Sequence, residues 1–301
     1  LDGSRLPEDP AALRDLALSA TVVGRISPEG KHRVVSALRR SGRYVAMVGD
    51  GVNDVPALKA ARLAVALGTG SDMAKSVSDV VLVTGDFGCV PAMIAEGRRL
   101  LRNLQRVTKL YVAKSALAAV LILSIGITPT AYPFLPRHLT LAAALTIGIP
   151  SFIIALAPSA GSWSIRSFLR DVSSFAVPAG TAAALGVLSS YLFCVDVAGL
   201  TVEEGRTVAV TVLVLVGLYL VLALEVAGWR RGGAVGALVL AMLALYALVL
   251  AFPGAREFFA LVTPTPLMIV ASGVGASLSI AGLALTDARF IPGRSDAPPR
   301  G

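Results

Sequence analysis

Six apolar segments, each close to the length of a membrane-spanning helix, constrain the fold of this chain more than any other feature. They cover residues 108–127, 139–157, 175–195, 207–227, 234–252 and 265–285. A helix needs about 20 apolar residues to cross a bilayer. Charged residues make up only 15% of the chain, compared with roughly 25% in soluble proteins. We therefore expect an all-α bundle of six transmembrane helices in a lipid bilayer, and a multi-pass position in the cell membrane.

Basic residues between the spans predict the orientation of this bundle. Cytoplasmic loops of membrane proteins carry an excess of Lys and Arg. These residues gather before the first span, after the second and fourth spans, and near the C-terminus. We therefore expect residues 1–107 and the C-terminus on the cytoplasmic side. The same bias explains the net charge of +8. Because the basic residues lie mostly beside apolar spans, we expect no nucleic-acid partner.

The segment before the first span has the pattern of a soluble α/β unit. Strand-like runs at 21–26, 44–48, 63–67 and 80–83 alternate with helix-like runs. One helix start is Ser27-Pro28-Glu29, where Ser can cap the helix and Pro occupies its first turn. Strands that alternate with helices predict a Rossmann-like parallel sheet.

A long basic helix is expected over residues 91–114, because no Pro or Gly interrupts it after Gly97. Its second part would form a stalk that enters the first span. We accordingly predict four parts: part of a soluble domain at 1–97, the stalk at 98–114, six spans within 108–285, and a tail at 286–301.

The most informative chemistry lies in the run VAMVGDGVNDVPALKAA, residues 45–61. Asp50 follows directly after a strand, which is where open parallel sheets bind their ligands. Gly49 and Gly51 on either side of it let the backbone turn tightly and approach a ligand closely. This loop is therefore a candidate ligand-binding site.

Three polar side chains of this loop could bind a metal ion. Asp50, Asn53 and Asp54 present oxygen atoms within five residues. Hard oxygen ligands suit Mg²⁺, which usually takes one or two protein carboxylates and leaves places for water and phosphate. The alternative is an Asx-rich turn that caps a helix. That interpretation explains Asp54 and Pro56, but it does not explain the other two polar residues.

The run GDGVNDVPALKAA resembles the hinge motif of P-type ATPases, whose phosphorylation domain has the haloacid dehalogenase (HAD) fold. Val48 stands where the family often has Thr. The run RISPEGKHRVV, residues 25–35, resembles a second block of the family, in which a Lys contacts the phosphoryl group. That residue is Lys31 here. The resemblance implies an α/β HAD-like partial phosphorylation domain followed by the bundle.

The resemblance also implies roles for four residues. Asp50 would hold Mg²⁺ directly, and Asp54 and Asn53 would position the metal, its waters and the phosphoryl oxygens. Lys31 would neutralise charge on the transferred phosphoryl group, although a solvated helix lysine is the alternative. This division suits phosphoryl transfer, which depends mainly on positioning and electrostatics.

The family's nucleophile is an Asp within DKTGT that forms an aspartyl-phosphate, and this chain contains no such run. The resemblance implies that the nucleophile, the ATP-binding domain, the actuator domain and four more membrane helices belong to the remainder of the same pump polypeptide. The chain would supply the Mg²⁺-binding loop and six membrane helices of an ATP-driven cation pump. By itself, it is expected not to hydrolyse ATP.

Few groups in the spans could contact a transported ion. In the family, ions bind among the fourth, fifth and sixth helices, and the first two spans here would be the fifth and sixth. Lys114 and Ser115 in one span, and Thr146 and Pro150 in the next, are the candidates for the ion path. Pro150 cannot donate to the Thr146 carbonyl, which could then coordinate a cation, although a simple kink is the alternative. Lys114 could instead extend to the bilayer surface.

The usual transport carboxylates are missing from these spans. Ile147 precedes the Gly-Ile-Pro run where calcium or sodium/potassium pumps carry Asp. The layout still resembles the calcium/magnesium branch, which implies Ca²⁺ or Mg²⁺ as the transported cation. A phospholipid-flipping P-type ATPase remains an alternative, because flippases also lack these carboxylates. A membrane-anchored HAD phosphatase is another.

Two further residues have structural interpretations. Glu225 lies near Arg230 and Arg231 at the end of the fourth span, so we expect ion pairs at the membrane interface, and direct ion coordination is the alternative. His138 has no second His or Cys nearby, so we do not expect it to be a metal ligand.

Overall fold

The computed structural model describes residues 1–126, 130–156, 168–225 and 229–292. The chain divides into two compact units, Leu1–Glu96 and Gly97–Gly301. Each unit has its own hydrophobic core.

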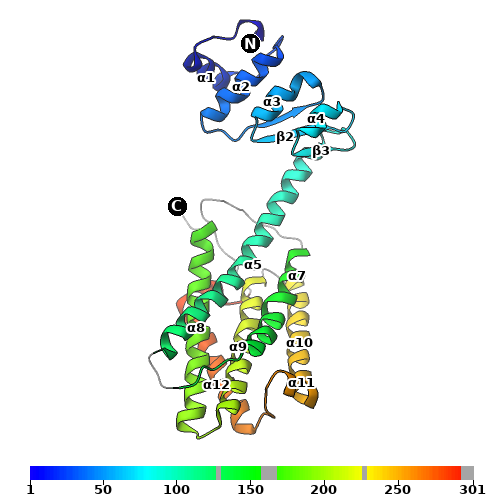
Figure 1. The fold of residues 1–301 in the computed structure, drawn as a ribbon. Coiled ribbons are helices and arrows are strands. Elements are labelled where there is room, and N and C mark those ends of the chain that lie inside the picture. Colours follow the sequence, from blue (N-terminus) through cyan, green and yellow to red (C-terminus); the bar gives the residue numbers. More distant parts are fainter. Residues whose placement is uncertain (127–129, 157–167, 226–228, 293–301) are drawn as a thin grey trace. The chain divides into compact units, whose positions relative to one another are not determined.

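The first unit contains a small parallel sheet and short helices (Figure 1). Its elements are η1 (Gly3–Arg5), α1 (Pro10–Ser19), α2 (Pro28–Arg40), β1 (Ala46–Gly49), η2 (Val52–Asp54), α3 (Val55–Ala60), β2 (Leu63–Leu67), α4 (Asp72–Ser76) and β3 (Val80–Leu82). The strands pair in parallel in the order β1-β2-β3. Gly49 lies opposite Ala66, and Leu67 lies opposite Leu82. The parallel sheet that the sequence predicts is therefore confirmed, and the carboxyl ends of its strands share one edge.

Local sequence explains where these helices begin. The Ser27 hydroxyl accepts a hydrogen bond from the Gly30 N–H (3.0 Å), and Pro28 follows it as the first residue of α2. The Ser71 hydroxyl caps α4 in the same way, by accepting from the Ala74 N–H. These caps satisfy backbone donors that have no partner within the helix.

The prediction of a strand at residues 21–26 is wrong. Within this segment only Gly24 makes a β-bridge, to Asp2. Arg25 has a φ of 53°, which turns the backbone out of the extended conformation. β-branched residues favour a strand only where a neighbouring strand is available to pair with, and this segment has one bridge instead of a ladder.

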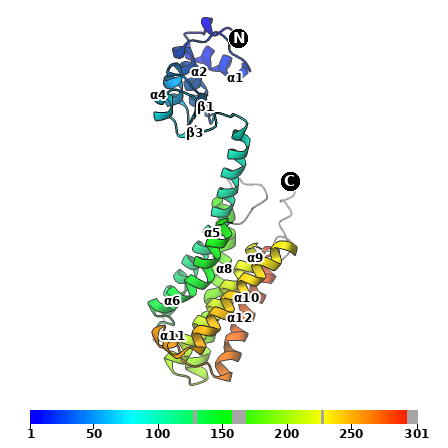
Figure 2. The same ribbon diagram turned by 90° about the vertical axis from the view of Figure 1, so that its right-hand side faces the viewer.

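The second unit is built from helices, most of them long and apolar, and the first of them begins within the residues of the first unit (Figure 2). They are α5 (Cys89–Ile125), α6 (Pro136–Ala143), the π turn η3 (Ala144–Gly148), α7 (Ile149–Leu156), α8 (Phe168–Leu192), the π turn η4 (Phe193–Val197), α9 (Val202–Glu225), α10 (Trp229–Ala251), α11 (Pro253–Phe258), α12 (Pro266–Thr286) and η5 (Ala288–Phe290). In the described part of the chain, six helical segments are long and apolar enough to cross a membrane. The predicted bundle of six transmembrane helices is therefore confirmed as an architecture, and the chain is a multi-pass membrane protein. The limits of the individual spans stay predictions.

Helix α9 organises the bundle, because it packs against α8, α10 and α12 (Figure 2). Its side chains include many that are fully buried, such as Val212 and Val216. Helices α8 and α12 also touch each other directly, and the Ser279 hydroxyl of α12 donates to the Ala182 carbonyl of α8 (3.1 Å). Small residues and interhelical hydrogen bonds of this kind hold membrane helices together, because lipid provides little hydrophobic drive.

Candidate active site and membrane pocket

The GDGVND loop begins at the carboxyl end of β1 and forms η2 before α3 starts. Gly49 is needed at its first position, because a Cβ atom there would lie 2.7 Å from the Cβ of Asp54. Asp54 is thus folded back against the end of β1, and its side chain is buried. The sequence suggests Asp54 as a cap for α3, but its side chain makes no capping hydrogen bond.

Asp54 instead pairs with Lys31, which α2 supplies from another part of the unit. The Lys31 ammonium donates to Asp54 Oδ1 (2.6 Å), and the Gly51 N–H donates to Asp54 Oδ2 (3.3 Å). Burial alone would raise the pKa of Asp54, but the bonds from Lys31 and from the backbone outweigh it and hold the pKa below its usual value. Asp54 is therefore a buried, ionised carboxylate that fixes both the loop and Lys31.

Asp50 has different surroundings. Its carbonyl accepts a hydrogen bond from the Ser71 N–H (2.7 Å), so the loop that follows β2 holds its backbone. The Asp50 side chain is exposed, as is that of Asn53. The carboxyl end of β1 thus presents one carboxylate and one amide to solvent, in the loop that also contains Asp54 of the Lys31–Asp54 pair.

The donor chemistry of this loop fits Mg²⁺. Among the described residues there is no group of three or more His, Cys, Asp or Glu side chains that could hold a metal. Mg²⁺ does not require one, because it usually binds through one or two carboxylates and keeps water and phosphate as other ligands. Asp50 is the exposed carboxylate of the loop, and Asn53 adds an oxygen. Both oxygens of Asp54 are engaged by Lys31 and Gly51, so direct metal binding by Asp54 stays a prediction.

The sequence predicts these residues as a site but does not predict two of their contacts. It did not predict that Lys31 and Asp54 pair directly, because they lie 23 residues apart. It also overlooked Ser71, whose backbone holds Asp50. The run Gly68-Thr69-Gly70-Ser71 directly after β2 was the available signal, since ligand sites form at the carboxyl ends of neighbouring parallel strands.

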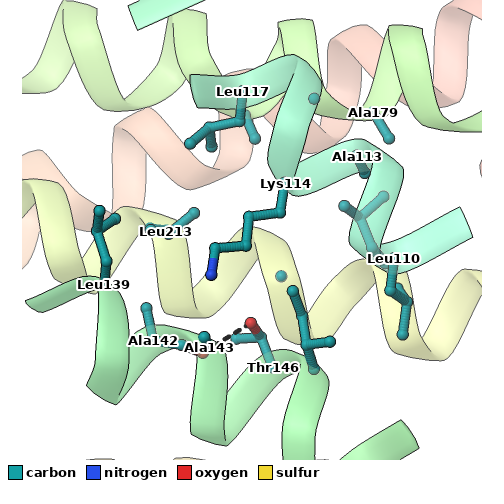
Figure 3. A pocket seen from close by; sticks show the side chains of 15 residues that line it. Leu110, Ala113, Lys114, Leu117, Leu139, Ala142, Ala143, Thr146, Ala179 and Leu213 are labelled. Atoms are coloured by element: carbon teal, nitrogen blue, oxygen red, sulfur yellow. Dashed lines mark hydrogen bonds between the residues drawn. The ribbon is translucent and has the colours of Figure 1, made fainter. Parts of the chain in front are cut away.

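In the second unit, Lys114 and Thr146 line one pocket between α5, α6, η3, α8 and α9 (Figure 3). The cavity has a volume of about 50 Å³, and all other lining residues are apolar or glycine. Figure 3 shows the Lys114 side chain extending from α5 across this space. Gly217 of α9 lets η3 approach closely, because a Cβ atom there would lie 2.7 Å from the Thr146 methyl carbon. Two of the four predicted ion-path residues are therefore brought together.

The helix that contains Thr146 includes a π turn, which the sequence did not predict. The Ile149 N–H donates to the Ala144 carbonyl five residues earlier and closes a π turn. Pro150 follows and has no N–H to offer the Thr146 carbonyl, while the Thr146 hydroxyl donates to the Ala142 carbonyl (2.7 Å). π turns occur often at functional sites. The ion-path roles of Thr146 and Pro150 stay predictions.

Ser115 is not among the residues that line the pocket. Its exposed side chain donates a hydrogen bond to the Tyr111 carbonyl (3.3 Å), within α5 itself. The structure therefore places Lys114, but not the neighbouring serine, at this space.

Glu225 and His138 both have structural partners. Glu225 is buried and pairs with Arg106 of α5 (3.5 Å). The side chains of Arg230 and Arg231, which we expected as its partners, lie outside the described residues. His138 is fully buried, accepts from the Leu135 N–H (3.1 Å) and lies 3.3 Å from the Ala260 carbonyl. Nδ1 thus satisfies a backbone N–H at the start of α6, and Nε2 links this helix to the segment that contains Ala260.

Comparison with known proteins gives matches to both parts of the chain. Residues 7–62 match the haloacid dehalogenase-like hydrolase family. The calcium-transporting ATPase CtpE of Mycolicibacterium smegmatis is 35% identical over 298 residues, which cover 94% of this chain and 37% of that protein. CtpE of Mycobacterium tuberculosis is also 35% identical, over 92% of this chain and 36% of that protein.

A more distant relative is the calcium-transporting ATPase of Bacillus subtilis, which is 32% identical over 158 residues, or 52% of this chain and 18% of that protein. The chain thus spans little more than a third of the length of the relatives that match most of it. Because these matches include both the HAD-like segment and the membrane helices, the chain belongs to the P-type cation ATPases and represents a C-terminal portion of such a protein.

Proposed function

We propose that this chain is the part of an ATP-driven cation pump that holds Mg²⁺ at the phosphoryl-transfer site and supplies six membrane helices. The observation that carries the proposal is the arrangement of Lys31, Asp50 and Asp54. An ionised, buried Asp54 holds the Lys31 ammonium (2.6 Å), and an exposed Asp50 lies in the same loop as Asp54, at the carboxyl end of β1. A cation and a free carboxylate at one edge of a parallel sheet suit the binding of Mg²⁺ and phosphate.

Each residue then has a task in phosphoryl transfer. Asp50 and Asn53 would bind Mg²⁺ through oxygen, while the Ser71 N–H keeps the Asp50 backbone in place. Bound Mg²⁺ would neutralise charge on the phosphate oxygens. The Lys31 ammonium would bind a phosphoryl oxygen, and Asp54 orients that ammonium. Groups fixed in advance in this way stabilise developing charge without having to reorganise.

The nucleophile would come from the remainder of the pump polypeptide. Strand β1 is at one end of the order β1-β2-β3, so in the described part of the chain its outer edge is open to another strand. A parallel strand at that edge would end beside Asp50. The aspartate that becomes phosphorylated, and the domain that binds ATP, would be supplied from there.

Ca²⁺ is the cation that we propose for transport, because the relatives matched over most of the chain are calcium-transporting ATPases. Mg²⁺ is the second candidate cation. We place the protein in the cell membrane, with residues 1–107 and the C-terminus in the cytoplasm, because of the distribution of basic residues. The homologues favour a cation pump over a phospholipid flippase or an anchored phosphatase.

The test is ATP-dependent uptake of radioactive Ca²⁺ into inverted membrane vesicles that contain the full-length polypeptide. Uptake is expected in the wild type and is expected to be lost in Asp50→Asn. Asp72→Asn is the matched control, because Asp72 is an exposed acid of the same unit, outside the loop. Stimulation of ATP hydrolysis by a phospholipid instead of Ca²⁺, or undiminished uptake by Asp50→Asn, would contradict the proposal.

A further inference from the structure

Lys114 carries a positive charge within a membrane-spanning helix and lines an almost entirely apolar pocket (Figure 3). Charges inside a bilayer are costly, and they normally pair with an opposite charge or serve transport. Thr146 is the other polar side chain at the pocket. Its hydroxyl hydrogen is already used on the Ala142 carbonyl (2.7 Å). Among the described residues that line the pocket, therefore, none carries a negative charge that balances Lys114.

Several acidic side chains of the described membrane unit have partners elsewhere. Glu225 pairs with Arg106 (3.5 Å), and Asp171 accepts from Gln105 (3.4 Å). Glu204 accepts hydrogen bonds from Thr201 near the start of α9. None of these acids lines the pocket. In the described part of the chain, no carboxylate lies at the pocket to balance Lys114.

We propose that Lys114 pairs with a carboxylate on a membrane span from the remainder of the pump, and that the transported cation displaces the Lys114 ammonium from that carboxylate. Charge complementarity selects this partner, because a positive charge in an apolar pocket attracts an acid. The Lys114 side chain is exposed in this chain, so an added span can reach it. The inference rests on the proposed function, because it assumes that the pump has such additional spans. The relatives are long enough to contain them, since the chain spans only 37% of one of them.

Lys114 then acts as a tethered competitor of the transported ion. An ammonium and a divalent cation cannot occupy the same carboxylate, so Lys114 would hold the site in its cation-free state. Each binding event would have to release the ammonium first, which lowers the apparent affinity for the cation. The lysine would thereby help to stabilise a pump from which cation has left.

The alternative is that Lys114 extends along α5 to the bilayer surface and has no partner. The two interpretations predict opposite effects of removing the charge. If Lys114 neutralises a buried carboxylate, Lys114→Met leaves that carboxylate unpaired and destabilises the cation-free protein. If Lys114 only extends to the surface, Met fits the apolar pocket at least as well, and stability is unchanged or increased.

The first measurement is the apparent melting temperature of the full-length pump in lipid nanodiscs, with a chelator present. Lys114→Met is expected to lower it by several degrees, and added Ca²⁺ is expected to restore it. Lys114→Arg keeps the charge and is expected to behave like the wild type. Lys109→Met is the matched control, because Lys109 belongs to the same helix but lies over the Phe175 ring (5.3 Å). A melting temperature for Lys114→Met equal to or above that of the wild type would overturn the inference.

The second measurement is equilibrium binding of radioactive Ca²⁺ to the same proteins. Lys114→Met is expected to bind Ca²⁺ about tenfold more tightly, the factor that results if the ammonium occupies the carboxylate about nine-tenths of the time. Unchanged or weaker Ca²⁺ binding would overturn the inference that the Lys114 ammonium competes with the cation. If the wild type pumps no Ca²⁺ but Lys114→Met is still less stable in chelator, the proposal of Ca²⁺ as the transported cation is contradicted. The ion pair between Lys114 and a carboxylate is still supported in that case.

Discussion

Asp50 and Asp54 lie in the same short loop, but their side chains have different surroundings. Asp54 is 7% exposed and is held by Lys31 and a backbone N–H. The Asp50 side chain is exposed. One carboxylate therefore maintains the structure of the site, and the other is available for a ligand. This difference can be tested because the same change, Asp to Asn, can be made at both positions.

Asp54→Asn is expected to destabilise the first unit, because it leaves the Lys31 ammonium without its partner. The expected loss is about 1–3 kcal/mol, toward the lower end because Lys31 is partly exposed to solvent. Asp50→Asn is expected to change stability by less than about 0.5 kcal/mol. Pulse proteolysis in urea of the chain in detergent measures both. Equal losses for the two variants would show that Asp54 has no special structural role.

The low pKa of Asp54 also predicts how stability depends on pH. An acid whose pKa is lowered by folding stabilises the fold above its unfolded pKa, about 3.9 for Asp. That contribution is lost as pH falls through the lower, folded pKa. Between about pH 5 and pH 3 the wild type should therefore lose more stability than Asp54→Asn. Parallel pH profiles for the two proteins would contradict the assignment of an ionised Asp54.

At the scale of elements, close helix contacts hold the membrane pocket in shape. Gly180 of α8 lies so near α5 that a Cβ atom would be 2.6 Å from the Cβ of Ala116. Gly217 brings α9 against the π turn η3 in a similar way. The shape of the pocket therefore depends on glycines at which neighbouring helices come too close for a side chain, and not only on how side chains interdigitate.

Gly180→Ala is expected to lower the apparent melting temperature of the chain in detergent, because overpacking costs about 1–3 kcal/mol. Gly282→Ala in α12 is the matched control, since nothing lies within 4 Å of the added Cβ. This change should leave the melting temperature unchanged or raise it, because Gly in a helix is less stable than Ala by about 0.5–1 kcal/mol. An equal change in melting temperature in both variants would argue against the close contact between α5 and α8.

Elements differ in how far the sequence predicts them. The spans and three of the strands follow from length and local pattern, as for β2, which has the expected bounds Leu63–Leu67. The strand at 21–26 fails because local preference does not supply a pairing neighbour. The π turn before Pro150 and the Lys31–Asp54 contact could not be predicted either. Both depend on how distant segments pack, and a single sequence gives residue types but not those distances.

At the scale of the whole molecule, the proposed function makes this chain the carrier of half of an active site and of six of a pump's membrane helices. Lys31, Asp50, Asn53 and Asp54 lie in the first unit, but the chain contains no DKTGT run to provide a nucleophile. We therefore expect residues 1–301 alone to show no vanadate-sensitive ATP hydrolysis. Steady, vanadate-sensitive release of phosphate by the purified chain would disprove this, and the full-length polypeptide is the positive control.

The most direct test of the central claim is transfer of radioactive phosphate from ATP to protein in the presence of Mg²⁺. The full-length polypeptide should acquire an acid-stable, hydroxylamine-sensitive label, as an aspartyl-phosphate does. The label should be strongly reduced in Asp50→Asn, and residues 1–301 alone should acquire none. A label on residues 1–301 alone, or full labelling of Asp50→Asn, would contradict the claim that this loop is the Mg²⁺-holding half of the site.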